Sequence, residues 1–395
     1  MTTQLVMADG PWTHHLKPFT LTRTASDVRM GILTLREKWE QRLRQKSTTS
    51  TSEPLSRVFP FEPEVGVNGF LFVRSNLLAS AGLAQAFQNL EMDESLWCKN
   101  VWLGCKVQRS PTVPLWELPI KCSEFKGHVD FLERVWHIFQ HNGKELESDF
   151  QLITEGRYSQ PIPEGNQVIQ SERVFIEEGA SVQFSIINAS SGPVYIGRNA
   201  EVMEGSIIRG PFALCEGSST KLGTKIYGPT TIGPFSKVGG EINNSVVFGF
   251  SNKAHDGFLG NSVIGEWCNL GADTNNSNLK NNYSIVDIYD YVEGGLVSTG
   301  LQFCGLFMGD HSKCGINTMF NTGTVVGVMS NIFGAGFPPK HIPSFSWGGA
   351  EGFQPFLAPK AFELAERVMS RRGLALSDAQ QVLLQGIYDG ENGRG

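Results

Sequence analysis

The chain has 395 residues, a hydrophobic fraction of 40% and a formal net charge of −6. This length predicts two or three domains with enough apolar surface to form buried cores. The negative charge argues against a nucleic-acid partner, and no apolar run approaches the roughly 20 residues that cross a bilayer, so neither nucleic acid nor membrane is expected as a partner.

The beginning of the chain, MTTQLVMADG, has no basic segment followed by an apolar run, so no signal peptide is expected. The seven cysteines are odd in number and form no C-x-x-C pair. Scattered cysteines are typical of free thiols in a reducing compartment, and the sequence therefore favours a cytoplasmic location. No two histidines have a metal-ligand spacing beside carboxylates or thiols, so no metal site is predicted.

Residues 1–160 alternate short apolar runs with helical patterns, which predicts a small α/β domain. A capping box over residues 34–37 predicts the start of a helix. The Ser/Thr tract over residues 47–52 predicts a solvated loop. Further predicted elements are strands over residues 5–8 and 101–105 and a helix over residues 129–139.

Residues 165–337 carry a six-residue repeat, with an aliphatic residue at one position and a small residue four places later. Such a repeat is typical of a parallel β-helix, in which each short strand buries one large side chain and the chain turns at tight corners. The repeat is clearest in two runs: Val246, Asn252, Phe258, Ile264 and Leu270, and then Met308, Cys314, Phe320, Val326 and Ile332.

Residues 338–395 follow the repeat after a Pro-Pro pair and are predicted to form a C-terminal cap. Amphipathic patterns predict helices over residues 358–371 and 377–388, the second with a Ser377/Gln380 capping box. The end of a solenoid exposes unpaired strand edges, so these helices are interpreted as a cap or an oligomer contact.

One hexad, beginning at Asn252, replaces its aliphatic residue with polar side chains. It holds Lys253 and Asp256, and His255 lies in its turn half, where a side chain points outward. Imidazole is the usual general base at neutral pH because its unperturbed pKa is about 6.5. A solvated surface histidine is the alternative, but the lost core residue favours a functional role for His255.

A polar loop leaves the repeat after this hexad, over residues 271–282. Asp273, Asn276 and Asn278 are candidate substrate ligands, although such residues also form ordinary turns. Lys253 either contacts phosphate or is simply solvated. Together with His255, this loop predicts a site for a small polar ligand.

The run SNKAHDGFLGNSVIGEWCNLGADTNNSNLKNNY resembles the acetyltransferase half of the bifunctional N-acetylglucosamine-1-phosphate uridyltransferase/glucosamine-1-phosphate acetyltransferase family. The later run GDHSKCGINTMFNTGTVVG resembles the coils that follow in that family. The resemblance covers residues 165–337. It implies a left-handed parallel β-helix, a homotrimer, and acetyl-CoA held along the edge of the coils between subunits.

The same resemblance implies roles for individual residues. His255 would deprotonate the sugar amine, Lys253 would approach the sugar phosphate, and Asn278 would help to bind the amino sugar. Two positions depart from the family pattern: Asp273 replaces a glycine in Gly-Ala-Gly-Thr, and Phe258 replaces a common tyrosine. These departures put the acyl site and the substrate choice in question.

The acyl donor is expected next to the first part of the polar loop. Gly271 and Ala272 are the candidate contacts, because their backbone N–H groups are suited to stabilising an oxyanion.

The N-terminal domain resembles sugar nucleotidyltransferases more weakly. The segment LKPFTLTR, with Lys17 and Arg23 as candidate phosphate contacts, is similar to the end of their signature loop. The Gly-rich part of that loop is missing, and backbone N–H groups need it to approach a triphosphate closely. This domain is therefore interpreted as a reduced version that is degenerate or altered in substrate, with Mg²⁺ needed only if it is active.

The leading hypothesis is an acetyl-CoA-dependent acyltransferase that N-acetylates an amino-sugar 1-phosphate in nucleotide-sugar synthesis. A second hypothesis is a working sugar-1-phosphate nucleotidyltransferase, in which the β-helix serves assembly or regulation. A third is a non-catalytic trimeric scaffold or ligand sensor. The sequence identifies neither the sugar, the nucleotide nor the acyl group.

Overall fold

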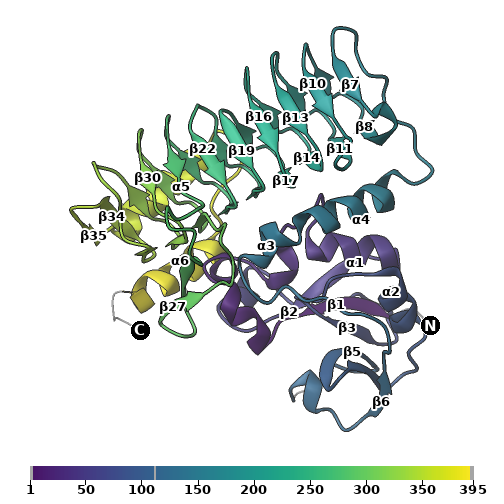
Figure 1. The fold of residues 1–395 in the computed structure, drawn as a ribbon. Helices are drawn as coiled ribbons and strands as arrows, with labels where there is room; N and C mark the ends of the chain where they lie inside the picture. Colours follow the sequence, from purple (N-terminus) through teal and green to yellow (C-terminus); the bar gives the residue numbers. More distant parts are fainter. Residues whose placement is uncertain (1–2, 111–112, 392–395) are drawn as a thin grey trace. The chain divides into compact units, whose positions relative to one another are not determined.

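The computed structural model describes residues 3–110 and 113–391, which fall into two compact units (Figure 1). No helix in this described part is long and apolar enough to cross a membrane. The first unit consists of Met1–Leu16, Thr22–Val28 and Leu33–Glu133, and the second of Lys17–Leu21, Arg29–Ile32 and Arg134–Gly395.

The first unit is a six-stranded mixed sheet with the order β2-β1-β3-β5-β4-β6. The strands β2, β1 and β3 are parallel, whereas β5 runs antiparallel to both β3 and β4. Strand β6 is parallel to β4. The strands are β1 (Gln4–Ala8), β2 (Ser47–Ser50), β3 (Phe70–Arg74), β4 (Glu94–Cys98), β5 (Val101–Val107) and β6 (Lys121–Glu124).

Alternation along β1 divides the core of this unit between the two faces of the sheet. Leu5 and Met7 pack on one face with residues of α1 (Leu35–Leu43) and α2 (Ala81–Gln88). Val6 and Ala8 pack on the other face in a second apolar cluster. Successive side chains of a strand point to opposite faces, so the four apolar residues that follow Gln4 in β1 serve both cores. The α/β fold and both predicted strands are confirmed.

The predicted capping box is present: the Thr34 side chain accepts from the Glu37 backbone, and the Glu37 side chain accepts from the Thr34 backbone. The loop predicted over residues 47–52 is wrong, because Ser47–Ser50 forms β2 beside β1. Arg36 donates hydrogen bonds to the hydroxyls of Ser47 and Thr49, which satisfies polar side chains on this strand.

The helix predicted over residues 129–139 is also wrong for most of its length. The backbone of Asp130 and Leu132 bonds instead to Leu78 and Asn76, so this segment is extended beside another loop. Helix formation starts only at α3 (His137–Gln140), which is followed by α4 (Asn142–Thr154). The short 3₁₀ helices are η1 (Pro11–Leu16), η2 (Phe19–Leu21), η3 (Ala25–Asp27), η4 (Leu55–Arg57), η5 (Leu115–Glu117) and η6 (Ser171–Arg173).

The second unit is a parallel β-solenoid with three faces, called here faces 1, 2 and 3 in the order in which each coil visits them. Face 1 contains β7 (Gln167–Ile169), β10 (Ile186–Asn188), β13 (Ile207–Arg209), β16 (Lys225–Tyr227), β19 (Glu241–Asn243) and β22 (Phe258–Gly260), followed by the pair β25 (Asn275–Asn276) and β30 (Met319–Phe320). Face 2 contains β8 (Val174–Ile176), β11 (Val194–Ile196), β14 (Phe212–Leu214), β17 (Thr230–Ile232), β20 (Val246–Val247), β23 (Val263–Ile264), β28 (Leu306–Met308), β31 (Thr324–Val326) and β33 (His341–Ile342). Face 3 contains β9 (Ser181–Val182), β12 (Glu201–Val202), β15 (Ser219–Thr220), β18 (Lys237–Val238), β21 (Asn252–Lys253), β24 (Asn269–Leu270), β29 (Lys313–Cys314), β32 (Asn331–Ile332), β34 (Ser346–Gly349) and β35 (Gly352–Pro355).

A regular coil has 18 residues, as the pairing of Phe212 with Thr230 shows. Most strands send at least one apolar side chain into a continuous interior, and the second predicted run, from Met308 to Ile332, lies in it throughout. Each coil buries its apolar side chains against the coils above and below, so the repeat is stable only as a stack. The predicted fold class is confirmed in its three parts: a mixed α/β sheet, a parallel β-solenoid and C-terminal helices.

Further elements pack on the solenoid within the same unit. Asn142 at the start of α4 donates to the carbonyl of Pro229 and accepts from the hydroxyl of Thr231 beside it on face 2. The solenoid also carries a hairpin of β26 (Asp287–Asp290) and β27 (Gly295–Ser298).

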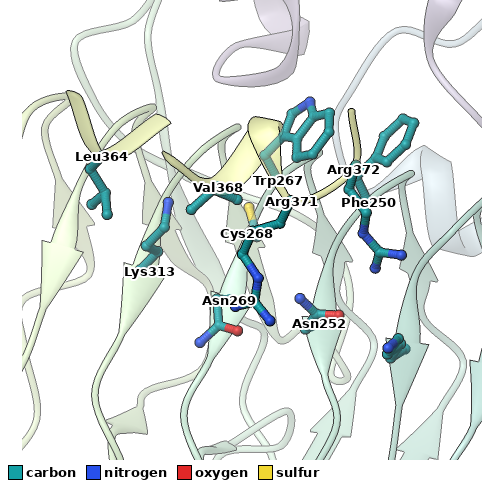
Figure 2. A pocket seen from close by; sticks show the side chains of 11 residues that line it. Phe250, Asn252, Trp267, Cys268, Asn269, Lys313, Leu364, Val368, Arg371 and Arg372 are labelled. Carbon is teal, nitrogen blue, oxygen red and sulfur yellow. The ribbon is translucent and has the colours of Figure 1, made fainter. Parts of the chain in front are cut away.

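The C-terminal helices α5 (Ala358–Ser370) and α6 (Asp378–Glu391) match the predicted ranges closely, and the Ser377/Gln380 capping box is present. They pack with Trp267 and Phe345 in one apolar cluster. Figure 2 shows two side chains of α5, Leu364 and Val368, beside residues of face 3.

Candidate active site

The polar hexad lies in register with its neighbours, but one residue later than the sequence pattern predicts. The interior position of β21 holds Lys253, which pairs with the core residue Val238, whereas Asn252 pairs with the outward Lys237. The predicted core positions Val246 and Phe258 are likewise replaced by Val247 and Leu259. The aliphatic side chain lost from the core is therefore replaced by a lysine.

A local shortening of the coils explains this shift of one residue. Val263 lies 17 residues after its partner Val246, one fewer than in a regular coil. Because of the missing residue, the interior residues Leu259 and Ile264 are five apart instead of six. A strict six-residue spacing extended back from Ile264 therefore places Asn252, instead of Lys253, in the interior.

Lys253 is almost fully buried, and its ammonium group is bonded to backbone oxygens. Nζ donates to the carbonyls of His255 at 2.8 Å, Asp256 at 3.0 Å and Gly239 at 3.3 Å. Burial lowers the pKa of Lys253 to about 8, against the opposing effect of the Asp256 and Asp273 charges. The side chain supports the turn that carries His255 from the inside of the solenoid.

The preceding coil is shortened where the chain turns from face 3 to face 1. Only Gly239 and Gly240 connect β18 to β19, whereas four residues connect β21 to β22. A Cβ atom on Gly239 would lie 2.4 Å from the carbonyl oxygen of Ala254, and Gly240 has a φ of +73°. Glycine is needed here because the short turn presses against the next coil in a left-handed conformation.

This short turn leaves a notch along the corner between faces 3 and 1, with longer turns above and below. The cavity has a volume of about 480 Å³. His255 and Asp256 line it from one coil, and Ala272 and Asp273 line it from the next. Its remaining lining residues are Met203, Lys221, Leu222, Gly239, Gly240 and Ala254.

The chemical groups in this notch are a histidine, two carboxylates and a lysine. His255, Asp256 and Asp273 are exposed, and in the described part of the chain the imidazole has no hydrogen-bond partner. The Asp273 backbone N–H donates to the carbonyl of Asp256 at 3.1 Å, which ties the two carboxylate-bearing turns together. An imidazole beside two carboxylates is suited to receive a proton from an amine.

The two predicted acyl-donor contacts, Gly271 and Ala272, differ in whether their backbone N–H groups are already hydrogen-bonded. The Gly271 N–H donates to the Cys314 carbonyl at 3.1 Å, so this donor is already used between coils. The Ala272 N–H has no hydrogen-bond acceptor among the described residues, and Ala272 lines the notch. Of the two predicted groups, the Ala272 N–H is the one available to a ligand.

The two predicted asparagine ligands, Asn276 and Asn278, lie outside the notch. Asn276 is buried, with its amide bonded to both the N–H and the carbonyl of Gly260. Asn278 donates to the side chain of Asn261 at 2.8 Å, at the far edge of face 1. Neither lines the notch around His255, so their roles as substrate ligands stay predictions.

Lys221 is in the notch, and sequence reasoning did not name it; Asp256 is there too, and the sequence placed it in the polar hexad without assigning it a role. The signal that indicates them is a shortened repeat: the interior residues Val238 and Ile242 are four apart instead of six. A shortened turn recedes from the corner, so residues on the flanking turns line the space that it leaves.

The first unit has no Gly-rich loop after β1. Trp12 of η1 occupies this region and packs edge-on against Trp116, with ring centres 5.1 Å apart. Of the candidate phosphate contacts, Arg23 is 5% exposed and Lys17 is half-buried. No cluster of metal-ligating side chains was found among the described residues, and the roles of Lys17 and Arg23 stay predictions.

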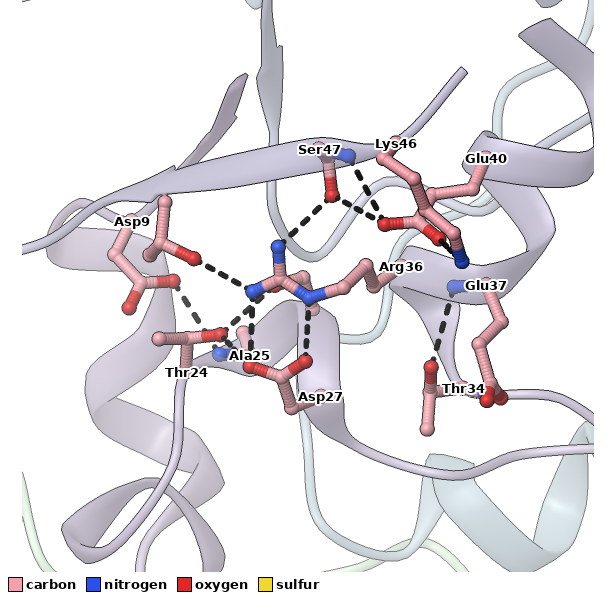
Figure 3. A network of polar contacts seen from close by, with 12 residues as sticks. Asp9, Thr24, Ala25, Asp27, Thr34, Arg36, Glu37, Glu40, Lys46 and Ser47 are labelled. Carbon is pink, nitrogen blue, oxygen red and sulfur yellow. Dashed lines mark hydrogen bonds and ion pairs between the residues drawn. The ribbon is translucent and has the colours of Figure 1, made fainter. Parts of the chain in front are cut away.

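A polar network also lies beside β1 in this unit (Figure 3). Asp9 accepts from the Thr51 hydroxyl and the Ala25 backbone, and Arg36 forms an ion pair with Asp27 at 2.6 Å. Burial raises the pKa of Asp9, in spite of these hydrogen bonds. The network anchors the loop after β1 and includes Asp9, a partly buried carboxylate directly after this strand.

Comparisons with known proteins match parts of the chain. The model of a family described as sugar nucleotidyl transferase matches residues 5–158. The chain is 28% identical over 144 residues to a bifunctional sugar-1-phosphate nucleotidylyltransferase/acetyltransferase of Sulfurisphaera tokodaii. It is 25% identical over 161 residues to an uncharacterized acetyltransferase, YaiX, of Escherichia coli.

These matches are partial. The first covers 36% of this chain and 35% of the Sulfurisphaera protein, and the second covers 40% of this chain and 69% of the Escherichia protein. The resemblance to the bifunctional family is confirmed as distant homology. Among solved structures, Arabidopsis UDP-N-acetylglucosamine acyltransferase is 17% identical with a TM-score of 0.23, and the match covers 59% of this chain and 91% of that one. The Francisella novicida enzyme of the same description is 13% identical with a TM-score of 0.26, covering 57% and 87%.

Proposed function

From a sugar nucleotidyl transferase domain joined to a parallel β-solenoid, we propose that this protein is an acyltransferase that acts on an amino-sugar phosphate. The observation that carries the proposal is the exposed His255 in a corner notch lined by Asp256 and Asp273. The distant relatives named as acetyltransferases support the reaction class, and acetyl-CoA is the acyl donor that we propose.

In the proposed reaction, the amine nitrogen of the sugar attacks the thioester carbon and forms the new C–N bond. His255 accepts the proton that the nitrogen loses, as a general base. The Ala272 N–H is the candidate donor to the oxyanion that develops on the carbonyl. The C–S bond then breaks, and the departing thiolate takes up a proton to leave as free CoA thiol.

The charges around the notch fit an amino-sugar phosphate. Asp256 and Asp273 would attract the ammonium form of the substrate, which releases one proton to solvent before attack, and His255 would take the second proton as the C–N bond forms. Lys221 is the cation available in the notch for the phosphate group. The Lys253 ammonium is bonded to three carbonyls, so we assign Lys253 the positioning of the His255 turn.

We also propose a homotrimer as the working assembly. The notch lies open along the corner of a single solenoid, and a neighbouring copy would enclose the substrate. Asn278 would reach a substrate only if such a copy placed it there, since it lies at the other edge of face 1 in its own chain.

The test measures release of CoA thiol from acetyl-CoA with glucosamine 1-phosphate. His255→Ala should lower the rate at least about 10²-fold, the usual contribution of a general base. Glu204→Gln is the matched control, because Glu204 is exposed in the equivalent turn of an earlier coil and does not line the notch. Equal rates for wild type and His255→Ala would reject the assignment.

A second candidate function is sugar-1-phosphate nucleotidyl transfer by the first unit, which the family match over residues 5–158 favours. It predicts Mg²⁺-dependent release of pyrophosphate from a nucleoside triphosphate and a sugar 1-phosphate, weakened by Arg23→Ala, since Arg23 belongs to the first unit. The absence of a Gly-rich loop after β1 argues against it. If neither reaction occurs and acetyl-CoA does not bind, the non-catalytic scaffold or ligand sensor becomes the preferred function.

A further inference from the structure

A second cavity, of about 510 Å³, lies between face 3 and α5 and is separate from the His255 notch (Figure 2). Its floor consists of one outward side chain from each of four successive strands: Lys237, Asn252, Asn269 and Lys313. The other lining residues are Phe250, Trp267, Cys268, Leu364, Val368, Arg371 and Arg372.

The four side chains of the floor form a row across neighbouring strands, with one strand spacing between each. Neighbouring strands lie about 4.8 Å apart, so the two lysines at its ends are separated by three strand spacings, about 14 Å at their backbones. The two asparagines between them add amide donors and acceptors. The Asn252 Oδ1 atom is buried and has no hydrogen-bond partner in the described part of the chain, so it is an acceptor suited to a ligand N–H or O–H group.

The cavity is strongly positive. Two lysines and two arginines line it, and no aspartate or glutamate does. None of these four cations forms a salt bridge within the described residues; Arg372 donates to the Phe235 carbonyl, and Lys313 donates to the His311 carbonyl. Four cations around one cavity without a carboxylate are a built site for an anion.

Both lysines of this cavity are desolvated, and Lys237 also lies near the charge of Arg372. Burial and the nearby charge of Arg372 lower the pKa of Lys237, and burial lowers the pKa of Lys313 to about 8. Bringing like charges together without counter-ions destabilises the folded protein. A bound anion would remove this repulsion and stabilise the fold.

We propose that this cavity binds a small molecule that contains a diphosphate group and a hydrogen-bond donor. The four cations would contact the phosphate oxygens, and Asn252 would accept from the donor. A diphosphate carries several charges along a short chain, which matches cations distributed along a row better than a single compact anion does. The proposal does not depend on the role of His255.

The test is titration calorimetry on the full chain at low salt. Inorganic pyrophosphate should bind, and UDP-N-acetylglucosamine and CoA, titrated separately, show whether a sugar nucleotide or a coenzyme is the better source of the diphosphate. Arg371→Gln/Arg372→Gln should weaken pyrophosphate binding at least about tenfold. Both arginines are exposed, so the fold should be retained, and a thermal midpoint without ligand at or above that of wild type would show this.

Arg367→Gln is the matched control. Arg367 is an exposed cation in the last turn of α5, just before the two arginines; it pairs with Glu363 and does not line the cavity, and its loss should leave binding within twofold. His255→Gln should likewise leave pyrophosphate binding unchanged. The proposal would be overturned by pyrophosphate that does not bind, by equal weakening in the control, or by sulfate that binds as tightly as pyrophosphate.

Discussion

The Lys253 ammonium donates a 2.8 Å hydrogen bond to the carbonyl oxygen of His255. This contact joins the interior of the solenoid to the turn that holds the candidate base. Lys253 is the only member of its hexad that faces the interior. The hexad therefore places a lysine where other coils have an apolar side chain, and the same lysine holds the turn of His255 in place.

Replacing this lysine should slow the proposed reaction without removing substrate binding. Lys253→Met keeps an unbranched side chain that is one atom shorter and apolar, but it leaves the His255 carbonyl without its hydrogen-bond donor. A misplacement of about 1 Å can cost on the order of 10²-fold in rate, so kcat should fall by about that factor while KM for acetyl-CoA changes less than twofold. Steady-state kinetics test this, and an unchanged kcat would contradict the positioning role.

The same variant should change how stability depends on pH. Burial lowers the pKa of Lys253 to about 8 in the folded protein, from 10.5, so the folded state binds fewer protons between these values. The unfolding free energy of wild type relative to Lys253→Met should therefore increase as the pH rises from 8 toward 10.5, by at most about 3 kcal/mol. Urea unfolding of both proteins at several pH values measures this, and a constant difference would count against it.

The short turn predicts different effects of two similar glycine substitutions. Gly240→Ala should destabilise by about 2–3 kcal/mol, because its Cβ would lie 2.7 Å from the Gly257 carbonyl oxygen and its φ is +73°. Gly223→Ala is the control: Gly223 has a φ of +68° at the same corner, but open space around it, so about 1 kcal/mol is expected. Thermal unfolding of the two variants compares them, and equal losses would mean that contact with the next coil is unimportant.

The carboxylates of the notch should affect binding of the amino sugar more than turnover. Asp256→Asn should raise KM for glucosamine 1-phosphate about tenfold, since a hydrogen bond to a charged group contributes roughly 1.5–3 kcal/mol. KM for acetyl-CoA should be unchanged in the same assay. An equal rise in both KM values would show a general disturbance of the corner instead of loss of an ammonium contact.

Regular repeats made most of the solenoid predictable, whereas shortened coils did not. From Met308 to Ile332 the six-residue spacing matches the interior side chains without a break. Around Lys253 the spacing changes to four and five residues, and the predicted phase was therefore wrong by one. Shortening one turn of a solenoid costs little folding free energy, because each coil contacts only its neighbours. The shortening nevertheless changes which residues of the following strands face inward.

The sequence by itself determined the solenoid, the capped helices and the presence of a polar hexad with His255, because these depend on local periodicity and on capping residues. Only the tertiary structure decided that Lys253 faces inward, that Gly239 and Gly240 open a notch beside His255, and that Lys237 and Lys313 share a basic cavity with α5. These relationships depend on how residues of different coils are aligned, and that alignment is set by packing between coils instead of by the spacing within any one of them.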